Sequence, residues 1–403
     1  MKIMVMGGGV AGAATAIALR QCTPAAVTVY EANPDPAGAV GSFLSLASNG
    51  LRALEHLGCL ERVQQVGFEV PRQRMWSSSG KLLGDVPRAR LSNDTRHSIT
   101  LRRGDLVEQL RLAAQAAGAR IVTGRRLTKA ARTGTGVRAE FDQGAPAEAD
   151  LLVGADGIWS PTREVLDPGA ARPQYAGLWS VSGTSDQPAD RPAIEPGTFN
   201  LVFARRGAFI YLNDGAGRIW WSAQVQDPIE PDLGSIALPA LIETFRHEQV
   251  PTAILRATTE LLRPTLHHVL APVSLWHDSR IVLTGDAAHP VGSGQGASMA
   301  VEDAVELGQR LGAVTTSDAA ALEQALAGYV GARRTRTAKM ITMANANRDA
   351  KTAGPIGRRV NDLIMPFFLR HFFEKNTAWL YQTPTTPVTT TPAAGQPRAS
   401  AVP

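Results

Sequence analysis

Short apolar runs alternate along the chain with longer segments in which apolar residues recur at helical spacing. The run at 3–6 (IMVM) predicts a buried strand, and 11–21 (AGAATAIALRQ) predicts an alanine-rich helix. The run at 26–31 (AVTVYE) predicts a second strand. A strand, a helix and a strand in this order predict a βαβ unit at the N-terminal end.

The same pattern continues to about residue 157. Residues 48–66 have apolar positions at helical spacing, and 105–117 (DLVEQLRLAAQAA) predict a further helix. Strands are expected at 121–124 (IVTG) and at 149–157 (ADLLVGADG), where the apolar run ends in a Gly/Asp turn.

The pattern changes between about 173 and 280. Four segments there resemble antiparallel strands with polar or glycine turns between them: QYAGLWSVSG, FNLVFA, GAFIYL and GRIWWSAQV. The α/β pattern resumes with IVLTG, followed by predicted helices at 296–312 and 318–347.

We therefore predict an α/β protein with a Rossmann-like domain, an inserted and mainly antiparallel β-sheet domain, and C-terminal helices. The inserted sheet is the expected substrate domain. The Pro- and Thr-rich tail is expected to be disordered. The expected boundaries are 1–172 for the first part of the Rossmann-like domain, 173–278 for the inserted domain, 279–382 for the second part with the C-terminal helices, and 383–403 for the tail.

Composition narrows the class of protein. The 403 residues are 44% hydrophobic and 19% charged, which is typical of a globular protein with a substantial core. The net charge of +5 comes with scattered arginines, so no nucleic-acid partner is expected. Cys22 and Cys59 stand in no metal-ligand or redox spacing, which favours free thiols in the cytoplasm and no metal site.

Stable membrane insertion is not expected. The apolar run at the N-terminus is too short for a signal peptide, and no stretch approaches the roughly 18 apolar residues of a membrane span. The segment LIMPFFLRHFF at 363–373 is interrupted by Pro366, Arg370 and His371. It could touch a membrane surface, but packing against the protein's own core is the favoured interpretation.

The first chemical motif is GGGVAG at 7–12. Gly7, Gly9 and Gly12 follow a strand and open a helix, which permits a tight turn and close approach of the backbone to a pyrophosphate. Glu31 stands 19 residues after Gly12, where a carboxylate can hold a ribose diol. In this βαβ context a dinucleotide site is favoured over a structural glycine turn. The carboxylate disfavours the 2′-phosphate of NADP at this site.

The second motif is LRRGDLVEQL at 101–110. Arg102 and Arg103 stand at a predicted helix N-terminus, where the helix dipole disfavours cations. Two interpretations stay equally open: the pair binds an anion such as the same pyrophosphate, or it is solvated at the surface.

The third motif combines GADGIWSPTRE (154–164) with GDAAHPVGSGQGASMAVEDA (285–304). Each follows a strand that ends in a Gly/Asp turn. Asp286 could accept hydrogen bonds from a polyol or could only cap a helix or turn. The glycine loop at 292–296 would offer backbone N–H groups to an electron-rich ring edge at a helix start.

These motifs together resemble the class A flavoprotein monooxygenases, over roughly residues 1–170 and 275–375. The resemblance implies one non-covalent FAD, with its ADP half at the N-terminal glycines and its flavin at the C-terminal glycine loop. It ties Asp156, Gly157 and Arg163 to FAD and the reduced nicotinamide, and assigns the ribityl chain to Asp286. The implied cofactor-binding set is Gly7, Gly9, Val10, Ala11, Gly12, Glu31, Ala32, Arg103, Leu127, Asp156, Gly285, Asp286, Pro290, Gly294, Gln295, Gly296 and Ala297.

One departure from the family pattern concerns the glycine loop at 291–296. The connection from Pro290 to Gln295 is shorter than the family commonly shows. This predicts an altered geometry of the pocket at the flavin edge.

The resemblance also implies an activity. NADH or NADPH reduces FAD, O2 forms a flavin C4a-hydroperoxide, and one oxygen atom hydroxylates or epoxidises an electron-rich, aromatic or polyketide-like small molecule. The chain has no second Gly-x-Gly-x-x-Gly, so the reductant is expected to dock transiently. The alternatives are a flavin-dependent dehydrogenase or reductase on the same scaffold, and a flavin-bound sensor without turnover. A halogenase is disfavoured because no Trp-x-Trp-x-Ile-Pro segment is present.

The substrate is expected between the flavin and the inserted sheet. Arg205 and Tyr211 are the candidates for a catalytic role, although a surface turn is the favoured location for Arg205 and Arg206. His289 is interpreted as a structural hydrogen-bonding residue rather than an acid–base group, and no catalytic base is assigned. About a third of six aromatic residues should line the pocket, since strand side chains alternate between faces: Phe199, Phe203, Phe209, Tyr211, Trp220 and Trp221.

Overall fold

The computed structural model describes residues 1–35, 42–292, 294–314, 318–351 and 354–382. The tail predicted to be disordered, 383–403, lies outside the described residues, as does Ser293 of the glycine loop.

A five-stranded parallel sheet carries the N-terminal glycine turn. Its central strand is β1, which pairs with β2, close in sequence, and with β12, which is distant. The edge strand β19 comes from beyond the inserted sheet and pairs with β12. Every pairing in it is parallel, as the predicted βαβ unit requires. The strand order is β19 (Ile281–Leu283), β12 (Leu151–Gly154), β1 (Lys2–Met6), β2 (Ala26–Tyr30) and β8 (Arg120–Val122).

Helix α1 (Val10–Cys22) packs closely against α8 (Gly296–Gly312) and α4 (Arg103–Ala116). A Cβ at Gly308 of α8 would come within 2.8 Å of the Ala18 Cβ of α1. The helices that begin at the two glycine loops therefore lie against each other, although almost the whole chain separates them.

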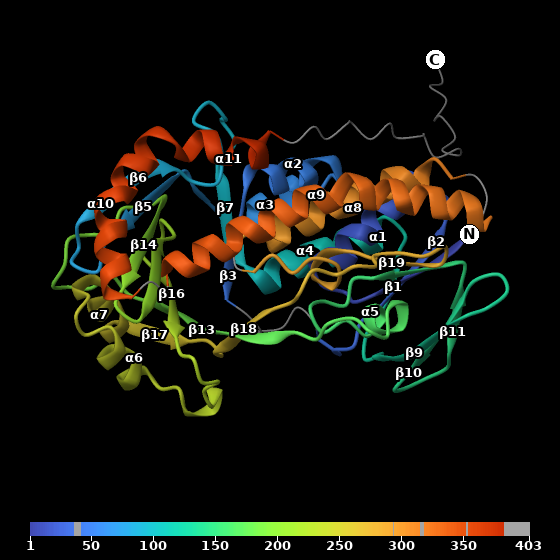
Figure 1. Cartoon of the computed structure of the whole chain (residues 1–403), viewed down its shortest axis with the longest axis horizontal. Helices are drawn as coiled ribbons and strands as arrows, with labels where there is room; N and C mark the ends of the chain where they lie inside the picture. The colour runs from blue at the N-terminus through green and yellow to red at the C-terminus, as the bar shows by residue number, and fades with distance from the viewer. Residues whose placement is uncertain (36–41, 293, 315–317, 352–353, 383–403) are drawn as a thin grey trace, which may run out of the picture.

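An eight-stranded sheet forms the second large layer (Figure 1). The pairing of β14 with β5 is parallel and the others are antiparallel. Two of its strands come from residues 72–87, ahead of the predicted inserted domain at 173–278. The order is β17 (Thr258–Leu261), β13 (Gln174–Ser185), β16 (Ile219–Gln226), β15 (Gly207–Asn213), β14 (Thr198–Ala204), β5 (Arg72–Trp76) and β6 (Leu82–Pro87), with β18 (Thr265–Val269) also paired to β13.

One face of this sheet is covered by α6 (Leu238–Thr244) and α7 (Gln249–Arg256). Phe209 and Trp221 of the sheet pack there with Phe245, which follows α6. The opposite face is turned toward a cavity described below.

Two three-stranded antiparallel sheets and several short helices complete the N-terminal part, and two 3-10 turns lie farther along the chain. The segment 48–66 is not one helix, because Gly58 adopts a φ of +66° and breaks it into α2 and α3. The small sheets are β3 (Phe43–Leu46), β7 (Ser98–Arg102) and β4 (Phe68–Val70), and β11 (Ala147–Ala149), β10 (Val137–Phe141) and β9 (Leu127–Arg132); the short helices are α2 (Ser48–His56), α3 (Leu60–Val66), α5 (Pro161–Leu166), and the 3-10 turns η1 (Leu233–Ser235) and η2 (Gly285–Ala287).

The C-terminal part consists of α9 (Ala319–Lys351), α10 (Pro355–His371) and α11 (Phe373–Tyr381). Figure 1 shows α9 running from the parallel-sheet region to the large sheet. No helix of the described residues is long and apolar enough to cross a membrane.

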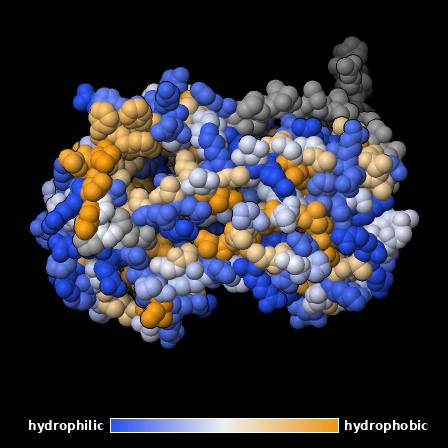
Figure 2. All heavy atoms as spheres, viewed as in Figure 1, coloured by the Kyte–Doolittle hydropathy of each residue, from blue (hydrophilic) through white to orange (hydrophobic). Residues whose placement is uncertain are grey.

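The favoured interpretation of segment 363–373, packing on the core, holds for one side of α10 only. Leu369 is 8% exposed and packs with Met365 against β6 residues. Leu363 and Phe367, in contrast, are 78% and 60% exposed. Figure 2 shows apolar side chains gathered at the surface over α10. The helix contains more apolar positions than one buried stripe can use.

Candidate active site

A cavity of about 1250 Å³ lies between the glycine loops and the inner face of the eight-stranded sheet. Its lining includes the start of α1, the start of α8, one side of α9 and residues of α10 and α11. The site is therefore assembled from segments across the whole described chain.

The N-terminal glycine turn is built for close backbone approach. Gly7 has a φ of +99°, and a Cβ there would lie 2.4 Å from the Ala155 carbonyl oxygen. A Cβ at Gly12 would lie 1.8 Å from the Gly7 carbonyl oxygen, whereas Gly9 faces open space in the cavity. Gly9 also precedes α1, whose first turn has no side-chain cap. The uncapped N–H groups and the helix dipole favour an anion at this point.

Glu31 lies directly beside this turn and is 7% exposed. Its Oε2 accepts the Gly8 N–H at 2.7 Å, and its Oε1 accepts the Asn33 N–H at 2.7 Å. Two backbone bonds leave acceptor capacity on the carboxylate for a diol. Four of the predicted cofactor residues do not line the cavity: Gly7, Gly12, Glu31 and Ala32.

The Gly285–Asp286 turn lies against α1 at the end of β19. Gly285 has a φ of +58°, and a Cβ there would come within 2.7 Å of the Ala11 Cβ. Its N–H donates to Asp303 Oδ2 at 2.9 Å, which fixes the turn. The Asp286 side chain lines the cavity and is exposed to it, and among the described residues it has no hydrogen-bond partner. Burial raises its pKa, against the opposing charges of His289 and Arg103.

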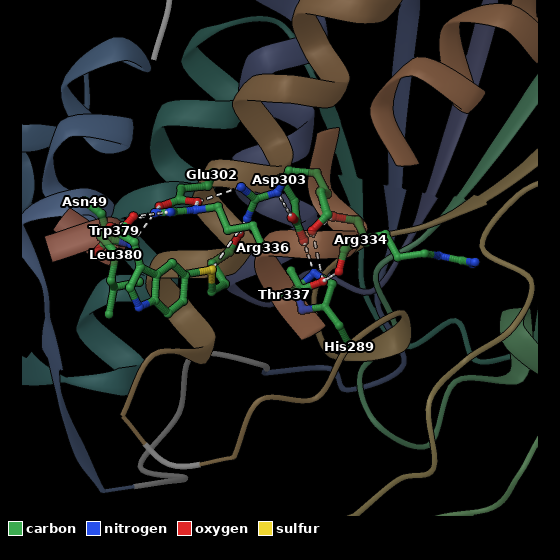
Figure 3. Close-up of polar contacts among 12 residues, drawn as sticks. Asn49, His289, Glu302, Asp303, Arg334, Arg336, Thr337, Trp379 and Leu380 are labelled. Atoms are coloured by element: carbon green, nitrogen blue, oxygen red, sulfur yellow. Dashed lines mark hydrogen bonds and ion pairs between the residues drawn. The ribbon is translucent and has the colours of Figure 1, made fainter. Parts of the chain in front are cut away.

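A buried network of charges holds this turn and the start of α8 (Figure 3). Asp303 is fully buried and bonds His289 Nε2 and Arg333 Nε, the latter at 2.6 Å. Glu302 accepts bonds from Arg333 and from Arg336, at 2.6 and 2.8 Å. Burial raises the pKa of Asp303, but the charges of His289 and Arg333 outweigh it and lower that pKa to about 2.

The network also joins α2 and α11 to α8 and α9. Asn49 of α2 donates to Glu302 at 2.7 Å, and Arg336 donates to the carbonyl oxygens of Trp379 and Leu380 in α11. His289 is 2% exposed and bonded to Asp303, which supports its interpretation from the sequence as a structural hydrogen-bonding residue. Sequence reasoning missed this network. The sequence feature that could have indicated the network is the pair of adjacent acids, Glu302 and Asp303, inside a largely apolar helical segment.

Asp156 and Arg163 join two loops rather than lining the cavity. Asp156 accepts hydrogen bonds from Ser160 Oγ and from Thr162 N and Oγ1, the last at 2.7 Å, so its carboxylate orders the start of α5. Arg163, 2% exposed, donates to the Ala287 carbonyl oxygen at 3.1 Å. The neighbouring Gly157 lines the cavity.

Of the two arginines left undecided by sequence, Arg102 forms an ion pair with Glu260 at 3.0 Å. Arg103 lines the cavity, and its side chain has no ion pair within the described part of the chain. Leu127, in contrast, is 7% exposed in the core and does not reach the cavity, and neither does Pro290. The remaining predicted cofactor residues on the cavity wall are Gly9, Val10, Ala11, Asp286, Gly294, Gln295, Gly296 and Ala297.

Strand alternation decides which aromatic residues reach the cavity. Phe199 and Phe203 line it, whereas Phe209, Tyr211 and Trp221 face α6 and α7. Tyr211 therefore lies in a core, 6% exposed, where burial raises its pKa to about 12. The sixth aromatic residue, Trp220, contacts the rings of Phe43 and Phe68.

Arg205 also lies away from the cavity. It is exposed in the turn between β14 and β15, and its backbone N–H donates to Glu248 at 2.9 Å. The structure thus brings neither candidate for a catalytic role, Arg205 or Tyr211, to the cavity wall.

The polar groups on the cavity wall that were not anticipated from the sequence include Arg88, His267, Lys351 and Tyr381. They belong to four separate segments and to no shared motif, so only the fold brings them together.

The residues present fit FAD. Three observations on one cavity support this. Among the described residues, the Asp286 carboxylate has no hydrogen-bond partner and the buried Gln295 Oε1 is unpaired. The helix that starts after Gly9 has no side-chain cap. A dinucleotide that ends in a polyol and a polar ring would satisfy these groups.

Comparisons with known proteins agree with this geometry. The family described as "FAD binding domain" matches residues 1–344. Kynurenine 3-monooxygenase of Salinispora arenicola is 31% identical over 379 residues, which cover 86% of this chain and 79% of the relative. Aurachin C monooxygenase/isomerase of Stigmatella aurantiaca is 29% identical over 345 residues, covering 83% and 85%. The structure of a salicylate hydroxylase substrate complex superposes with a TM-score of 0.77 at 21% identity, covering 95% of each chain, a likeness of fold.

Proposed function

The chain belongs to the class A FAD-dependent monooxygenase family, and on that premise we propose that it inserts one oxygen atom from O2 into a small molecule. NADH or NADPH is the reductant, and the substrate is electron-rich and aromatic or polyketide-like, to be hydroxylated or epoxidised. The observation that supports this most directly is the single cavity, which joins the cofactor-type residues to the inner face of the large sheet.

Three parts of FAD, namely the pyrophosphate, the adenosine ribose and the ribityl chain, would each have a group to hold them. The turn at Gly9 and the start of α1 would bind the pyrophosphate, with Arg103 nearby, and Glu31 would accept the adenosine ribose hydroxyls. Asp286 would accept the ribityl hydroxyls. When bound, FAD supplies hydride acceptance from the nicotinamide and the activation of oxygen.

The chain's own residues position the substrate and exclude water. Phe199, Leu201 and Phe203 of β14 form an apolar wall, and Met365 and Leu369 of α10 face the same cavity. An apolar enclosure of this kind would exclude water from the reacting atoms and so suppress side reactions. Glycine loop residues at the start of α8 would orient the flavin ring toward this wall.

Location and partners are part of the same proposal. Cys22 and Cys59 are both free thiols, which supports a reducing cytoplasm. The scattered arginines of the sequence favour a small molecule rather than a nucleic acid as the partner.

Purified protein should be yellow, and denaturation should release the flavin because attachment is non-covalent. The decisive measurement supplies 18O2 and NAD(P)H with a panel of phenols, aromatic acids and quinolones, and follows the label by mass spectrometry. One labelled oxygen atom per product is expected. NAD(P)H oxidation with an unlabelled, reduced product would favour the reductase alternative. An unlabelled, dehydrogenated product formed without NAD(P)H consumption, its electrons passing to O2, would favour the dehydrogenase alternative. Absence of bound flavin after FAD is added would overturn the proposal.

A further inference from the structure

Two cations line the cavity on the side of the large sheet and have no carboxylate partner. Arg88 follows β6, and Lys351 is the last residue of α9. Within the described residues neither forms an ion pair. The guanidinium of Arg88 lies 3.7 Å from the centre of the Phe199 ring and donates to Gln73 Oε1, which hold it in place.

Their surroundings make this arrangement costly without a ligand. Burial lowers the pKa of Arg88 to about 10. Burial and the nearby charge of Arg88 lower the pKa of Lys351 to about 8. His267, on β18, has its pKa lowered to about 4, by burial first and then by the charges of Lys351 and His268. Both residues are half-buried and line the cavity. Partly desolvated charges are favoured where an opposite charge compensates them, and here the described chain supplies no ion-pair partner.

Helix α9 sets the distance between these cations and the glycine loop. Met340 packs with Val291 of that loop, while Asn347, Ala350 and Lys351 line the cavity farther along the same helix. At 1.5 Å per residue, Lys351 lies roughly 16 Å from Met340 along the helix axis. A ligand that reaches both regions must therefore be elongated.

We propose that the substrate is an elongated organic acid whose carboxylate binds between Arg88 and Lys351 while its electron-rich ring lies beside the loop at 294–297. This inference rests on the proposed function, because it identifies the substrate class of that site. The planar guanidinium suits a carboxylate, and Lys351 adds a second charge. The apolar surroundings, Phe199 and Leu201 above all, suit a hydrocarbon spacer better than the hydrated phosphates of a nicotinamide cofactor.

The test uses FAD-loaded protein and two matched probes, 6-phenylhexanoate and its neutral amide, titrated by calorimetry. The acid should bind at least about tenfold more tightly than the amide, since bonds to charged groups are the stronger class. Lys351→Met and Arg88→Gln should each weaken binding of the acid about tenfold to hundredfold and leave the amide unchanged. Lys351→Arg retains the charge and should retain the preference.

Lys81→Met is the matched control, because Lys81 is an exposed cation in the turn before β6 and lies off the cavity. It should alter neither affinity.

Equal affinities for acid and amide in the unmutated protein would overturn the inference, as would parallel losses of both in Lys351→Met. Weaker NADPH binding in the variants with unchanged acid binding would instead assign these cations to the reductant. Flavin absorbance of every sample distinguishes failure of the proposed function from failure of this inference. Protein that binds no FAD contradicts the proposed function. Protein that is saturated with FAD but does not prefer the acid contradicts this inference alone.

Discussion

Asp286 is a carboxylate that faces the cavity and receives no hydrogen bond from the described residues. If it binds the ribityl chain, Asp286→Ala removes a charged acceptor from the cofactor and nothing from the apo-protein fold. We expect the FAD dissociation constant to rise by about one to two orders of magnitude. Fluorescence titration of apo-protein with FAD measures this. The capping interpretation predicts the reverse pattern, a lower melting temperature of the apo-protein with unchanged FAD affinity.

Glu31 and Asp156 both accept backbone N–H groups, but of the two carboxylates only Glu31 accepts an N–H of the glycine turn, that of Gly8. Glu31→Lys should therefore weaken FAD binding more than Asp156→Ala does, because it replaces a ribose acceptor by a donor. Asp156→Ala leaves Ser160 and Thr162 unpaired at the start of α5 and should cost about 1–3 kcal/mol of unfolding free energy. Flavin occupancy and apo-protein melting of both variants check this. Full occupancy in Glu31→Lys would show that the turn is not the adenosine site.

At the scale of elements, the buried charge network couples α8 to α9. Arg333, 4% exposed, is the cation shared by Glu302 and Asp303. Arg333→Met leaves two buried carboxylates without this partner and should lower the unfolding free energy by about 3–5 kcal/mol. Arg334→Met, at an exposed neighbouring position, is the matched control and should cost much less. Denaturant unfolding measures the free energy of both variants. Equal losses in the two would contradict a specific contribution of the buried ion pairs of Arg333 to stability.

The same network predicts a dependence of stability on pH. The pKa of Asp303 is lowered to about 2 in the folded protein, below an unfolded value of about 3.9. Its contribution is therefore fully present above pH 4 and is lost as pH falls through about 2. Acid unfolding followed by circular dichroism should begin at higher pH in Asp303→Asn, which lacks the carboxylate. An unchanged acid midpoint would contradict the assigned role.

At the scale of the whole molecule, the cavity depends on cations brought from distant segments. Lys351, with a pKa of about 8, faces Arg88 and His267, and Tyr381 lies beside Arg88. Between pH 7 and 9 His267 is neutral, Arg88 stays charged, and Tyr381 keeps its proton. Affinity for 6-phenylhexanoate should thus begin to fall as pH rises through about 8, because free Lys351 loses its charge. Calorimetry across this range, with Lys351→Met showing no such step, tests the prediction; a flat profile would contradict it.

The sequence by itself determined the features that depend on neighbouring residues. The βαβ unit, the glycine turn at 7–12 and the helix at 296–312 follow from apolar spacing and from conformations that only glycine adopts readily. The family resemblance rested on these local motifs, and the family match confirmed it. Residues at both ends of the chain could be assigned to one cofactor for the same reason.

Only the tertiary structure decided which side chains meet. Tyr211 faces a core because strand parity, which sequence does not establish, turns Ile210 to the cavity instead. Strands β5 and β6 join the large sheet because β5 pairs in parallel with β14. No local sequence pattern predicts that pairing. The pairing of Asp303 with Arg333, and the approach of Arg88 to Lys351, join residues far apart in the chain. Such contacts arise from the packing of whole elements, and no short segment of sequence encodes them.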